Sequence, residues 1–294
     1  MRAHAILGAG GVGGFVAAIL AHAGERVILL LRPESRAGYP GTLTLESPFG
    51  NLVAPVQPAL VLEEPVDVLW VATKATQLSA ALEAVPDPSL ARMVVPLLNG
   101  VDHVSLLRSR FPADRVVPAT IAGELERTAP GKILHRSPFA GFVFSAAGAP
   151  GLTGAADILS RFGCSCRFEA DELTMLWRKL VMLAPMALTT TATGLTLGEL
   201  KALPEWAARF EATVREACAV ARAAGAMVEA EETLKVLGGM PATLRSSMQK
   251  DVAAGRPPEL DAIAGPILRG GSAYGIPVPA TTALAAAVQS RRSS

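Results

Sequence analysis

Six residues near the amino terminus, Gly8-Ala9-Gly10-Gly11-Val12-Gly13, have the spacing GxGxxG. They follow an apolar run at residues 3–7 and open a helix-compatible stretch at 15–23, and a second apolar run follows at 26–31. In such a strand–turn–helix–strand unit the first glycine permits a tight turn, the second lets a pyrophosphate approach the backbone, and the third lets the helix pack on the strand. Orphan amides at the start of the helix then face the phosphates. The segment therefore predicts a dinucleotide site, the alternative being the same turn without a ligand.

The residue after the second strand indicates which dinucleotide binds. An NAD enzyme usually places Asp or Glu there to bind the ribose hydroxyls. This chain places Arg32 there, with Arg36 nearby and Glu34 after a proline. Because a guanidinium suits a 2′-phosphate through paired charged hydrogen bonds, NADP(H) is favoured. The alternative is a solvated arginine on a loop.

A lysine in the second half of the chain is the best candidate for a catalytic acid. Reducing a carbonyl requires a hydride donor and an acid that protonates the developing alkoxide. All four histidines fall in the first half, and His103, the one near a predicted ligand edge, is interpreted as a surface residue. Lys179 lies on a predicted helix at 172–188, where partial desolvation would lower its pKa; a lysine extending to the helix edge is the alternative. Its apolar neighbours three, four or seven residues away are Met175, Met182, Leu183 and Met186.

The apolar runs predict the elements that position these residues. Runs at 66–72, 93–98 and 116–119 continue a strand–helix alternation that is typical of an α/β, doubly wound parallel sheet. Segments 130–135 and 141–145 are interpreted as a hairpin or edge strands closing that sheet. Helices separated by Gly or Pro are predicted at 172–188, 203–224, 229–237, 241–254 and 259–274. We therefore expect a Rossmann-like NADP-binding domain at 1–169 and an all-α substrate and catalytic domain at 170–294.

Composition narrows the class of protein. The 294 residues are 50% hydrophobic, 18% charged and 5% aromatic, with a formal net charge of +1, which argues against nucleic acid as a partner. No apolar run approaches the roughly 18 residues needed to span a bilayer, so no membrane partner is expected. Three cysteines in no zinc or redox spacing predict no metal and a cytoplasmic location. A secretory signal at the amino terminus is disfavoured because five glycines interrupt its apolar core.

Further segments occur in order along the chain. They are Val71-Ala72-Thr73-Lys74-Ala75-Thr76-Gln77, Leu97-Leu98-Asn99-Gly100-Val101, Leu176-Trp177-Arg178-Lys179-Leu180, Ser246-Ser247-Met248-Gln249-Lys250-Asp251 and Gly255-Arg256-Pro257-Pro258-Glu259-Leu260-Asp261. With the early glycines, this pattern resembles the ketopantoate (2-dehydropantoate) reductase family from Gly8 to about Leu284. The resemblance implies an NADPH-binding domain, a helical domain and a site in the cleft between them. There, hydride passes from NADPH to the C2 carbonyl of a branched 2-oxo acid, and a helix lysine supplies the proton.

The resemblance also implies roles for individual residues. Lys179 matches the catalytic lysine, which also contacts substrate, and Asn99 matches an asparagine near nicotinamide and substrate. Lys74 matches a lysine beside the cofactor, and Arg32 matches the arginine for the 2′-phosphate. Ser247 and Glu259 match residues that contact substrate and cofactor respectively. A carboxylate in the first turn of any helix is the alternative for Glu259.

The pattern departs from the family on the lysine helix. The family carries asparagines four and eight residues after the lysine, where this chain has Leu183 and Ala187. A site without them loses discrimination for the substrate's hydroxyl and carboxylate, although hydroxyls of Thr189, Thr190 and Thr191 could substitute. We therefore expect a reductase of 2-dehydropantoate in pantothenate biosynthesis, or a paralogue that reduces a more apolar oxo acid. A protein that binds NADPH as a sensor without catalysis is the alternative from another functional class. The helical domain could also support a homodimer.

Overall fold

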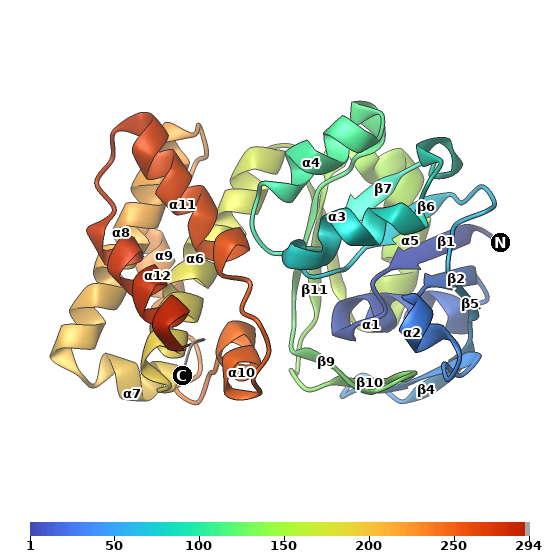
Figure 1. Ribbon diagram of the computed structural model, residues 1–294, viewed down its shortest axis with the longest axis horizontal. Coiled ribbons are helices and arrows are strands. Elements are labelled where there is room, and N and C mark those ends of the chain that lie inside the picture. The colour runs from blue at the N-terminus through green and yellow to red at the C-terminus, as the bar shows by residue number, and fades with distance from the viewer. Residues whose placement is uncertain (292–294) are drawn as a thin grey trace. The chain divides into compact units, whose positions relative to one another are not determined.

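The computed structural model describes residues 1–291, which divide into two compact units whose elements are labelled in Figure 1. The first, here called the sheet unit, comprises residues 1–98 and 103–172. The second, the helical unit, comprises the short segment Asn99–Asp102 and the chain from Leu173 onward. Within residues 1–291, no helix combines the length and hydrophobicity needed to span a bilayer.

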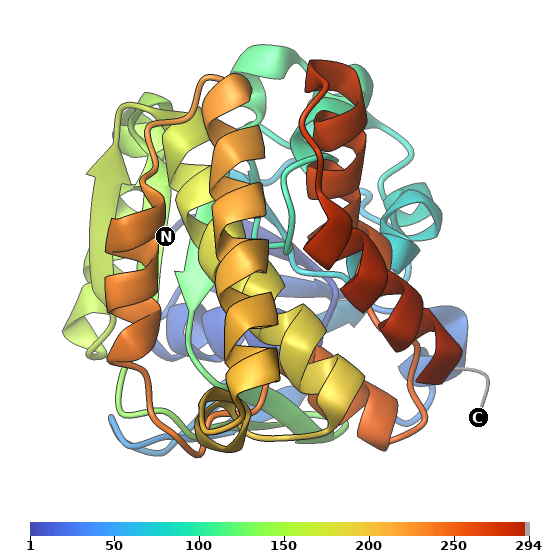
Figure 2. The same ribbon diagram turned by 90° about the vertical axis from the view of Figure 1, so that its left-hand side faces the viewer.

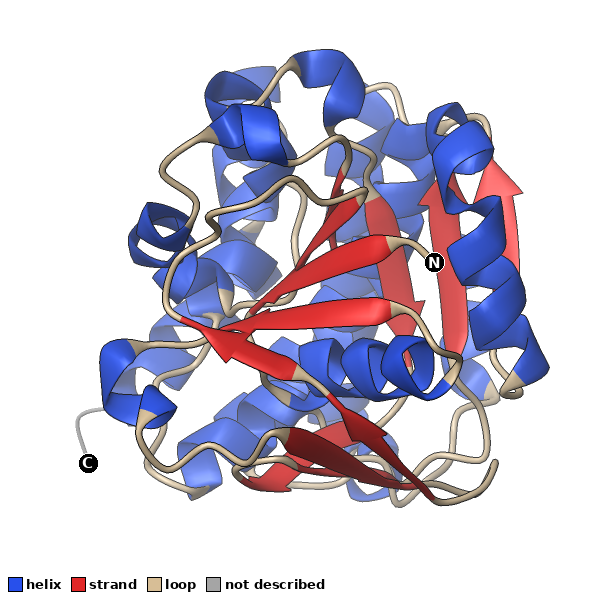
Figure 3. Ribbon diagram, turned by 90° about the vertical axis from the view of Figure 1, so that its right-hand side faces the viewer, coloured by secondary structure: helices blue, strands red, loops and turns tan. Residues whose placement is uncertain are grey.

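Five parallel strands form the main sheet of the sheet unit, seen among the red arrows of Figure 3. In spatial order they are β5 (Gln57–Ala59), β2 (Arg26–Leu30), β1 (Ala3–Leu7), β6 (Val68–Val71) and β7 (Val94–Pro96). Leu7 pairs with Leu30 on one side and Val71 on the other, so these three strands end at one edge. Their side chains are almost all buried, as expected for a parallel sheet covered on both faces. The predicted α/β fold class is confirmed.

Two further sheets correct one prediction about strand pairing. Segments 130–135 and 141–145 do not close the parallel sheet. The four-stranded sheet contains β4 (Leu52–Pro55), β3 (Thr42–Glu46), β10 (Lys132–His135) and β9 (Leu125–Ala129), and the three-stranded sheet contains β12 (Ser165–Glu169), β11 (Gly141–Ser145) and β8 (Ala119–Ala122). The hairpin of β3 and β4, which the apolar-run pattern did not predict, gives β10 a partner because its alternating side chains leave one face to bury.

The helix α1 (Gly11–His22) forms the centre of the sheet unit. It packs against β1 and β2 on one side and against β3, β4, β9 and β10 on the other (Figure 3). Its residues from Gly13 to Ala21 are all buried, which explains why the helix is apolar around its whole circumference. The helix α5 (Ala149–Arg161) packs on α1 and β12, and α2 (Pro33–Arg36), α3 (Leu78–Ala81) and α4 (His103–Arg110) complete the α-helices of this unit.

The helical unit is built around α8, which contacts α7, α9, α11 and α12 (Figure 2). Its helices are α6 (Glu172–Thr193), α7 (Leu197–Lys201), α8 (Pro204–Ala223), α9 (Ala230–Gly238), α10 (Ser247–Ala253), α11 (Leu260–Tyr274) and α12 (Pro279–Arg291). The helix predicted at 241–254 begins only at Ser247. Backbone carbonyls of the preceding segment accept hydrogen bonds from the start of α7 instead. Gly198 N donates to Ala242 O at 2.8 Å, and Leu197 N donates to Leu244 O at 3.0 Å.

Candidate functional site

Two positions of the turn between β1 and α1 must be glycine because other backbone atoms lie where a Cβ would be. Gly8 has φ +104°, and a Cβ there would lie 2.7 Å from the backbone of Ala72 and Thr73 at the end of β6. A Cβ at Gly13 would collide with the carbonyl oxygen of Gly8, so α1 can approach β1 only without one. Gly10 has open space around its Cβ position. The turn is thus closed on the protein side and open at Gly10, as a bound pyrophosphate requires.

The amino end of α1 offers donors to that open side. The N-cap is Gly10, which has no side chain to cap the helix, and the first i→i−4 bond runs from Gly14 N to Gly10 O at 2.8 Å. The amides of residues 11–13 therefore have no acceptor within the helix. Together with the helix dipole, they make this end of α1 suited to binding an anion.

Cationic and polar groups follow the neighbouring strand ends. Arg32 is exposed two residues after β2, and its Nε lies 3.3 Å from Glu34 Oε1. Lys74 follows β6, and beside it the buried hydroxyl of Thr73 has no hydrogen-bond partner within residues 1–291. Because the carboxyl ends of β1, β2 and β6 meet at one edge, Arg32 and Lys74 flank the glycine turn. These groups fit a phosphorylated dinucleotide, and the orphan hydroxyl marks a position where such a ligand would supply a bond.

Lys179 lies half-buried on α6 of the helical unit. Burial lowers the pKa of Lys179 to about 8, and the charge of Glu259 opposes that shift. Along the same helix face, Met182, Leu183 and Met186 are partly buried and apolar. An ammonium held in such surroundings is a stronger acid than a solvated lysine, so it can give a proton near neutral pH.

Glu259 connects Lys179 to Asn99. The amide Nδ2 of Asn99 donates to Glu259 Oε2 at 3.2 Å, although the two residues are 160 positions apart. Glu259 is the N-cap residue of α11, yet its side chain makes no capping bond to that helix. The carboxylate therefore accepts from Asn99 and acts on Lys179 through its charge, and it does not cap its own helix.

The resemblance implies that Ser247 contacts substrate. Ser247 is exposed on the first turn of α10 and makes no hydrogen bond to Lys179, Glu259 or Asn99 within the described chain. The serine before it is the buried one: Ser246 Oγ accepts from Gln249 N at 3.1 Å and lies 2.9 Å from Thr190 Oγ1.

His103, interpreted from sequence as a surface residue, is in fact buried at the start of α4. His103, Val104 and Leu107 form the buried face of α4, and Leu107 belongs to the core of the sheet unit.

Two of the three consecutive threonines at 189–191 direct their hydroxyls to backbone carbonyls of α6, the helix on which they lie. Thr189 Oγ1 donates to Pro185 O at 2.6 Å and Thr190 Oγ1 donates to Met186 O at 2.7 Å, so both hydroxyls bond within their own helix. Thr191 is buried and its hydroxyl has no partner among residues 1–291. Leu183 is half-buried, whereas Ala187 is fully buried in the core of the helical unit.

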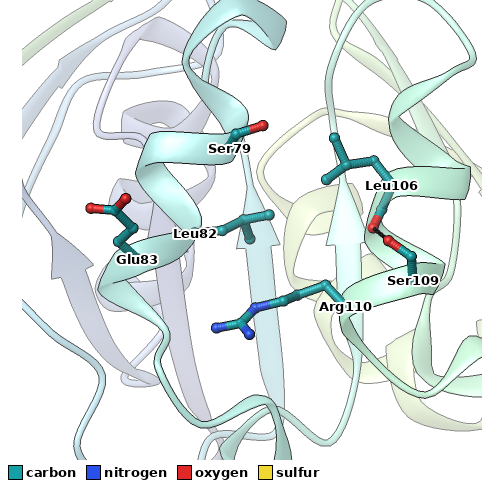
Figure 4. A pocket seen from close by; sticks show the side chains of 6 residues that line it. All are labelled: Ser79, Leu82, Glu83, Leu106, Ser109 and Arg110. Carbon is teal, nitrogen blue, oxygen red and sulfur yellow. Dashed lines mark hydrogen bonds between the residues drawn. The ribbon is translucent and has the colours of Figure 1, made fainter.

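A shallow pocket in the sheet unit holds none of the predicted site residues. Figure 4 shows it between α3 and α4, lined by Ser79, Leu82, Glu83, Leu106, Ser109 and Arg110. Arg110 is engaged with backbone, donating to Val85 O at 3.0 Å, and Ser109 Oγ donates to Leu106 O at 2.7 Å. We assign no chemistry to this surface.

Two family models match this chain. Residues 4–147 match the family model described as "Ketopantoate reductase PanE/ApbA", and residues 171–292 match "Ketopantoate reductase PanE/ApbA C terminal". The 2-dehydropantoate 2-reductase of Caulobacter vibrioides is 33% identical over 299 residues, covering 97% of this chain and 98% of that protein.

Solved structures share the fold. A crystal structure of a PanE/ApbA family ketopantoate reductase from Ralstonia eutropha is similar with a TM-score of 0.87 and 29% identity, covering 99% of this chain and 98% of that one. A ternary structure of D-mandelate dehydrogenase with NADH and anilino(oxo)acetate has a TM-score of 0.88 at 22% identity, with the same coverage. At that identity, the second likeness concerns the fold alone.

Proposed function

Because the chain belongs to the ketopantoate reductase family, we propose that it reduces a 2-oxo acid with NADPH, with 2-dehydropantoate as the leading substrate and pantoate as product. The chain is an oxidoreductase, and the family uses NAD(P)H. The observation that carries the proposal is the grouping of Lys179, Glu259 and Asn99 in the helical unit. Pantoate production would place the enzyme in pantothenate biosynthesis.

The residues of the helical unit supply the acid for this reaction. When bound, the reduced nicotinamide supplies a hydride to the carbonyl carbon. Lys179 Nζ gives a proton to the oxygen that becomes an alkoxide, so that ketone, hydride and proton together yield the alcohol. The neutral lysine then regains a proton from solvent. A pKa of about 8 keeps most of the lysine charged at pH 7 while weakening its hold on the proton.

Glu259 has a distinct part in this scheme. Its charge raises the pKa of Lys179 and so limits the effect of burial, which keeps the acid form populated. Asn99 donates to the same carboxylate and fixes the direction in which its second oxygen lies. Both groups act on the lysine's protonation without exchanging a proton themselves.

The preference for NADPH is supported by Arg32. Its guanidinium is exposed after β2, where the ribose of a dinucleotide lies in Rossmann folds. Glu34 pairs with it, and a carboxylate at this place also suits the hydroxyls of NADH. We favour NADPH because the arginine comes first after the strand, and comparing the two dinucleotides tests that choice.

A second candidate substrate is favoured by the apolar face of α6. Met182, Leu183 and Met186 follow Lys179 on one side of the helix. The hydroxyls of Thr189 and Thr190 donate to carbonyls of that same helix. A hydrocarbon group beside the ketone would suit this face better than the hydroxyl of 2-dehydropantoate. The solved D-mandelate dehydrogenase of the same fold holds anilino(oxo)acetate, an example of an oxo acid with an apolar substituent.

The deciding experiment follows NADPH absorbance with purified protein and a panel of 2-oxo acids. The panel includes 2-dehydropantoate, 2-oxoisovalerate (which lacks the hydroxymethyl group) and phenylglyoxylate (which carries an aromatic ring). Turnover highest on 2-dehydropantoate supports the leading substrate, and turnover highest on the other two supports the second. Tight NADPH binding without turnover on any of them would contradict both and indicate a sensor.

A further inference from the structure

The four-residue segment Asn99–Asp102, which connects β7 to α4, is held on α11 at both of its ends. At the first end, Asn99 donates to Glu259, the N-cap residue of α11. At the other end, Asp102 accepts a hydrogen bond from Arg269 in the third turn of the same helix. Between them, Val101 packs against the apolar core of the helical unit. The segment is therefore seated along α11 rather than extended into solvent.

The close contact between this segment and α11 depends on a proline and a glycine. Pro266 lies inside α11 and has no N–H, so the carbonyl of Ala262, four residues earlier, lacks its helical donor. Gly100 sits against this carbonyl: a Cβ at Gly100 would collide with Ala262 O. The φ of Gly100 is +84°, a conformation that glycine adopts without strain. Glycine at 100 thus satisfies both the close approach and the backbone conformation.

A second glycine makes room for the arginine. Arg269 bridges two carboxylates, since its Nη1 donates to Asp261 Oδ1 at 2.7 Å while its Nη2 donates to Asp102. A Cβ at Gly265, one helical turn before the arginine, would overlap the guanidinium and lie 2.7 Å from Asp261 Oδ1. The guanidinium therefore lies against the backbone of Gly265, and from there it donates to the carboxylate of Asp102.

We propose that Arg269 is a positioning residue, which holds the Asn99–Asp102 segment on α11 through Asp102 and thereby keeps the Asn99 amide on the carboxylate of Glu259. Arg269 touches neither Lys179 nor Glu259 in this arrangement; it acts through the segment. The inference rests on the proposed function, because Glu259 matters there as the charge that faces Lys179. The charged groups that face Arg269 are Asp102 and Asp261, and those that face Glu259 include Lys179.

The consequence concerns the acid of the proposed reaction. When Asn99 leaves Glu259, the carboxylate loses a donor that fixes it, and its average distance from Lys179 increases. The lysine then loses part of the interaction that raises its pKa, so the alkaline limb of the pH profile moves to lower pH. Removing the positive charge of Arg269 by itself would raise the pKa of a nearby lysine. The two mechanisms predict shifts of opposite sign.

Two variants break the link in different ways. Arg269→Gln removes the charge, whereas Gly265→Ala keeps the charge and displaces the guanidinium. Gly265 is buried and directly precedes Pro266, so alanine there can also strain the helix. Arg269→Gln leaves the backbone unchanged and is therefore the deciding variant if the two differ. The matched control is Arg215→Gln on α8, because Arg215 likewise bridges two carboxylates, those of Glu211 and Glu231.

The measurements are hydrogen exchange of peptides covering residues 97–104 and the pH profile of kcat/KM for the best 2-oxo acid of the panel. We expect Arg269→Gln and Gly265→Ala to speed exchange in residues 99–102, lower kcat/KM by about 5- to 10-fold, and move the alkaline limb to lower pH. The lower figure corresponds to about 1 kcal/mol, the upper end for an exposed ion pair. Arg269→Lys should restore part of the rate, and Arg215→Gln should match the wild type.

Other outcomes would overturn the proposal. Unchanged exchange in both variants, or a limb that moves to higher pH, would show that Arg269 does not position the segment. The proposed function fails separately: if Lys179→Ala retains full turnover, the acid is wrong, whereas the exchange result still reports on Arg269. Gly100→Ala should reproduce the effects of Gly265→Ala, and Gly24→Ala controls for backbone strain, since Gly24 has φ +89° with open space around its Cβ position.

Discussion

Burial lowers the pKa of Lys179 and the carboxylate of Glu259 raises it, and the balance leaves the lysine at about 8. The two residues lie on different helices, α6 and the N-cap of α11, and are 80 positions apart in the sequence. Neither influence alone would suit an acid that works near neutral pH, because a solvated lysine releases its proton poorly and a fully desolvated one is uncharged. The balance of the two influences gives Lys179 a pKa suited to the proton transfer that we propose for it.

Replacing Lys179 by alanine should abolish most turnover. We expect a loss of roughly 100-fold or more in kcat, the scale of a missing general acid, with NADPH affinity unchanged. Stopped-flow or steady-state absorbance measures the rate, and fluorescence titration measures the affinity. Lys235→Ala, at an exposed lysine on α9, is the control. Unchanged turnover in Lys179→Ala would refute the catalytic role.

The pH profile of the reduction should report the same lysine. Because the acid must be protonated, kcat/KM should be level below pH 8 and fall about tenfold per pH unit above it. Oxidation of the hydroxy acid should show the opposite limb and rise with pH. Glu259→Gln removes the interaction that raises the pKa, so its limb should lie below that of the wild type. If the limb stays at the same pH in Glu259→Gln, Glu259 does not influence the pKa of the catalytic acid.

Cofactor preference should depend on the Arg32–Glu34 pair. Arg32→Ala should weaken NADPH binding by about 10-fold or more, because a charge-assisted hydrogen bond is lost, and should leave NADH binding nearly unchanged. Glu34→Gln should act in the other direction, since it frees the guanidinium and removes a negative charge near the 2′-phosphate. Titrations with both dinucleotides measure these effects. Equal losses for the two in Arg32→Ala would remove the phosphate assignment.

A buried histidine should make the protein sensitive to acid. His4 on β1 is buried and accepts from Trp70 Nε1 at 3.3 Å, and burial lowers its pKa to about 4. Between pH 6.5 and 4 the unfolded chain binds this proton and the folded one does not, so stability falls as pH falls through that window. The full effect is about 3 kcal/mol. Urea unfolding at pH 7 and pH 5 should show a smaller difference for His4→Gln than for His22→Gln, an exposed control.

Local physical rules explain what the sequence predicted. The turn of Gly8, Gly10 and Gly13 could be read directly, because its geometry depends on neighbours within one strand–helix unit. The apolar positions around Lys179 likewise follow from helical periodicity over three turns. The partners of the strands at 132–135 and 141–145 could not be read, since a strand's alternation shows which face is buried but not which strand lies beside it.

The sequence by itself determined the fold class, the glycine turn and the helix that carries Lys179. Only the tertiary structure decided that Asn99 reaches Glu259, that Gly100 closes on the carbonyl freed by Pro266, and that Asp102 meets Arg269. The partners in these contacts are separated by 160 or more positions, and each sits in a segment of ordinary composition. Such contacts depend on how the segment and the helices pack together. The periodicity of apolar residues within one segment does not contain that information.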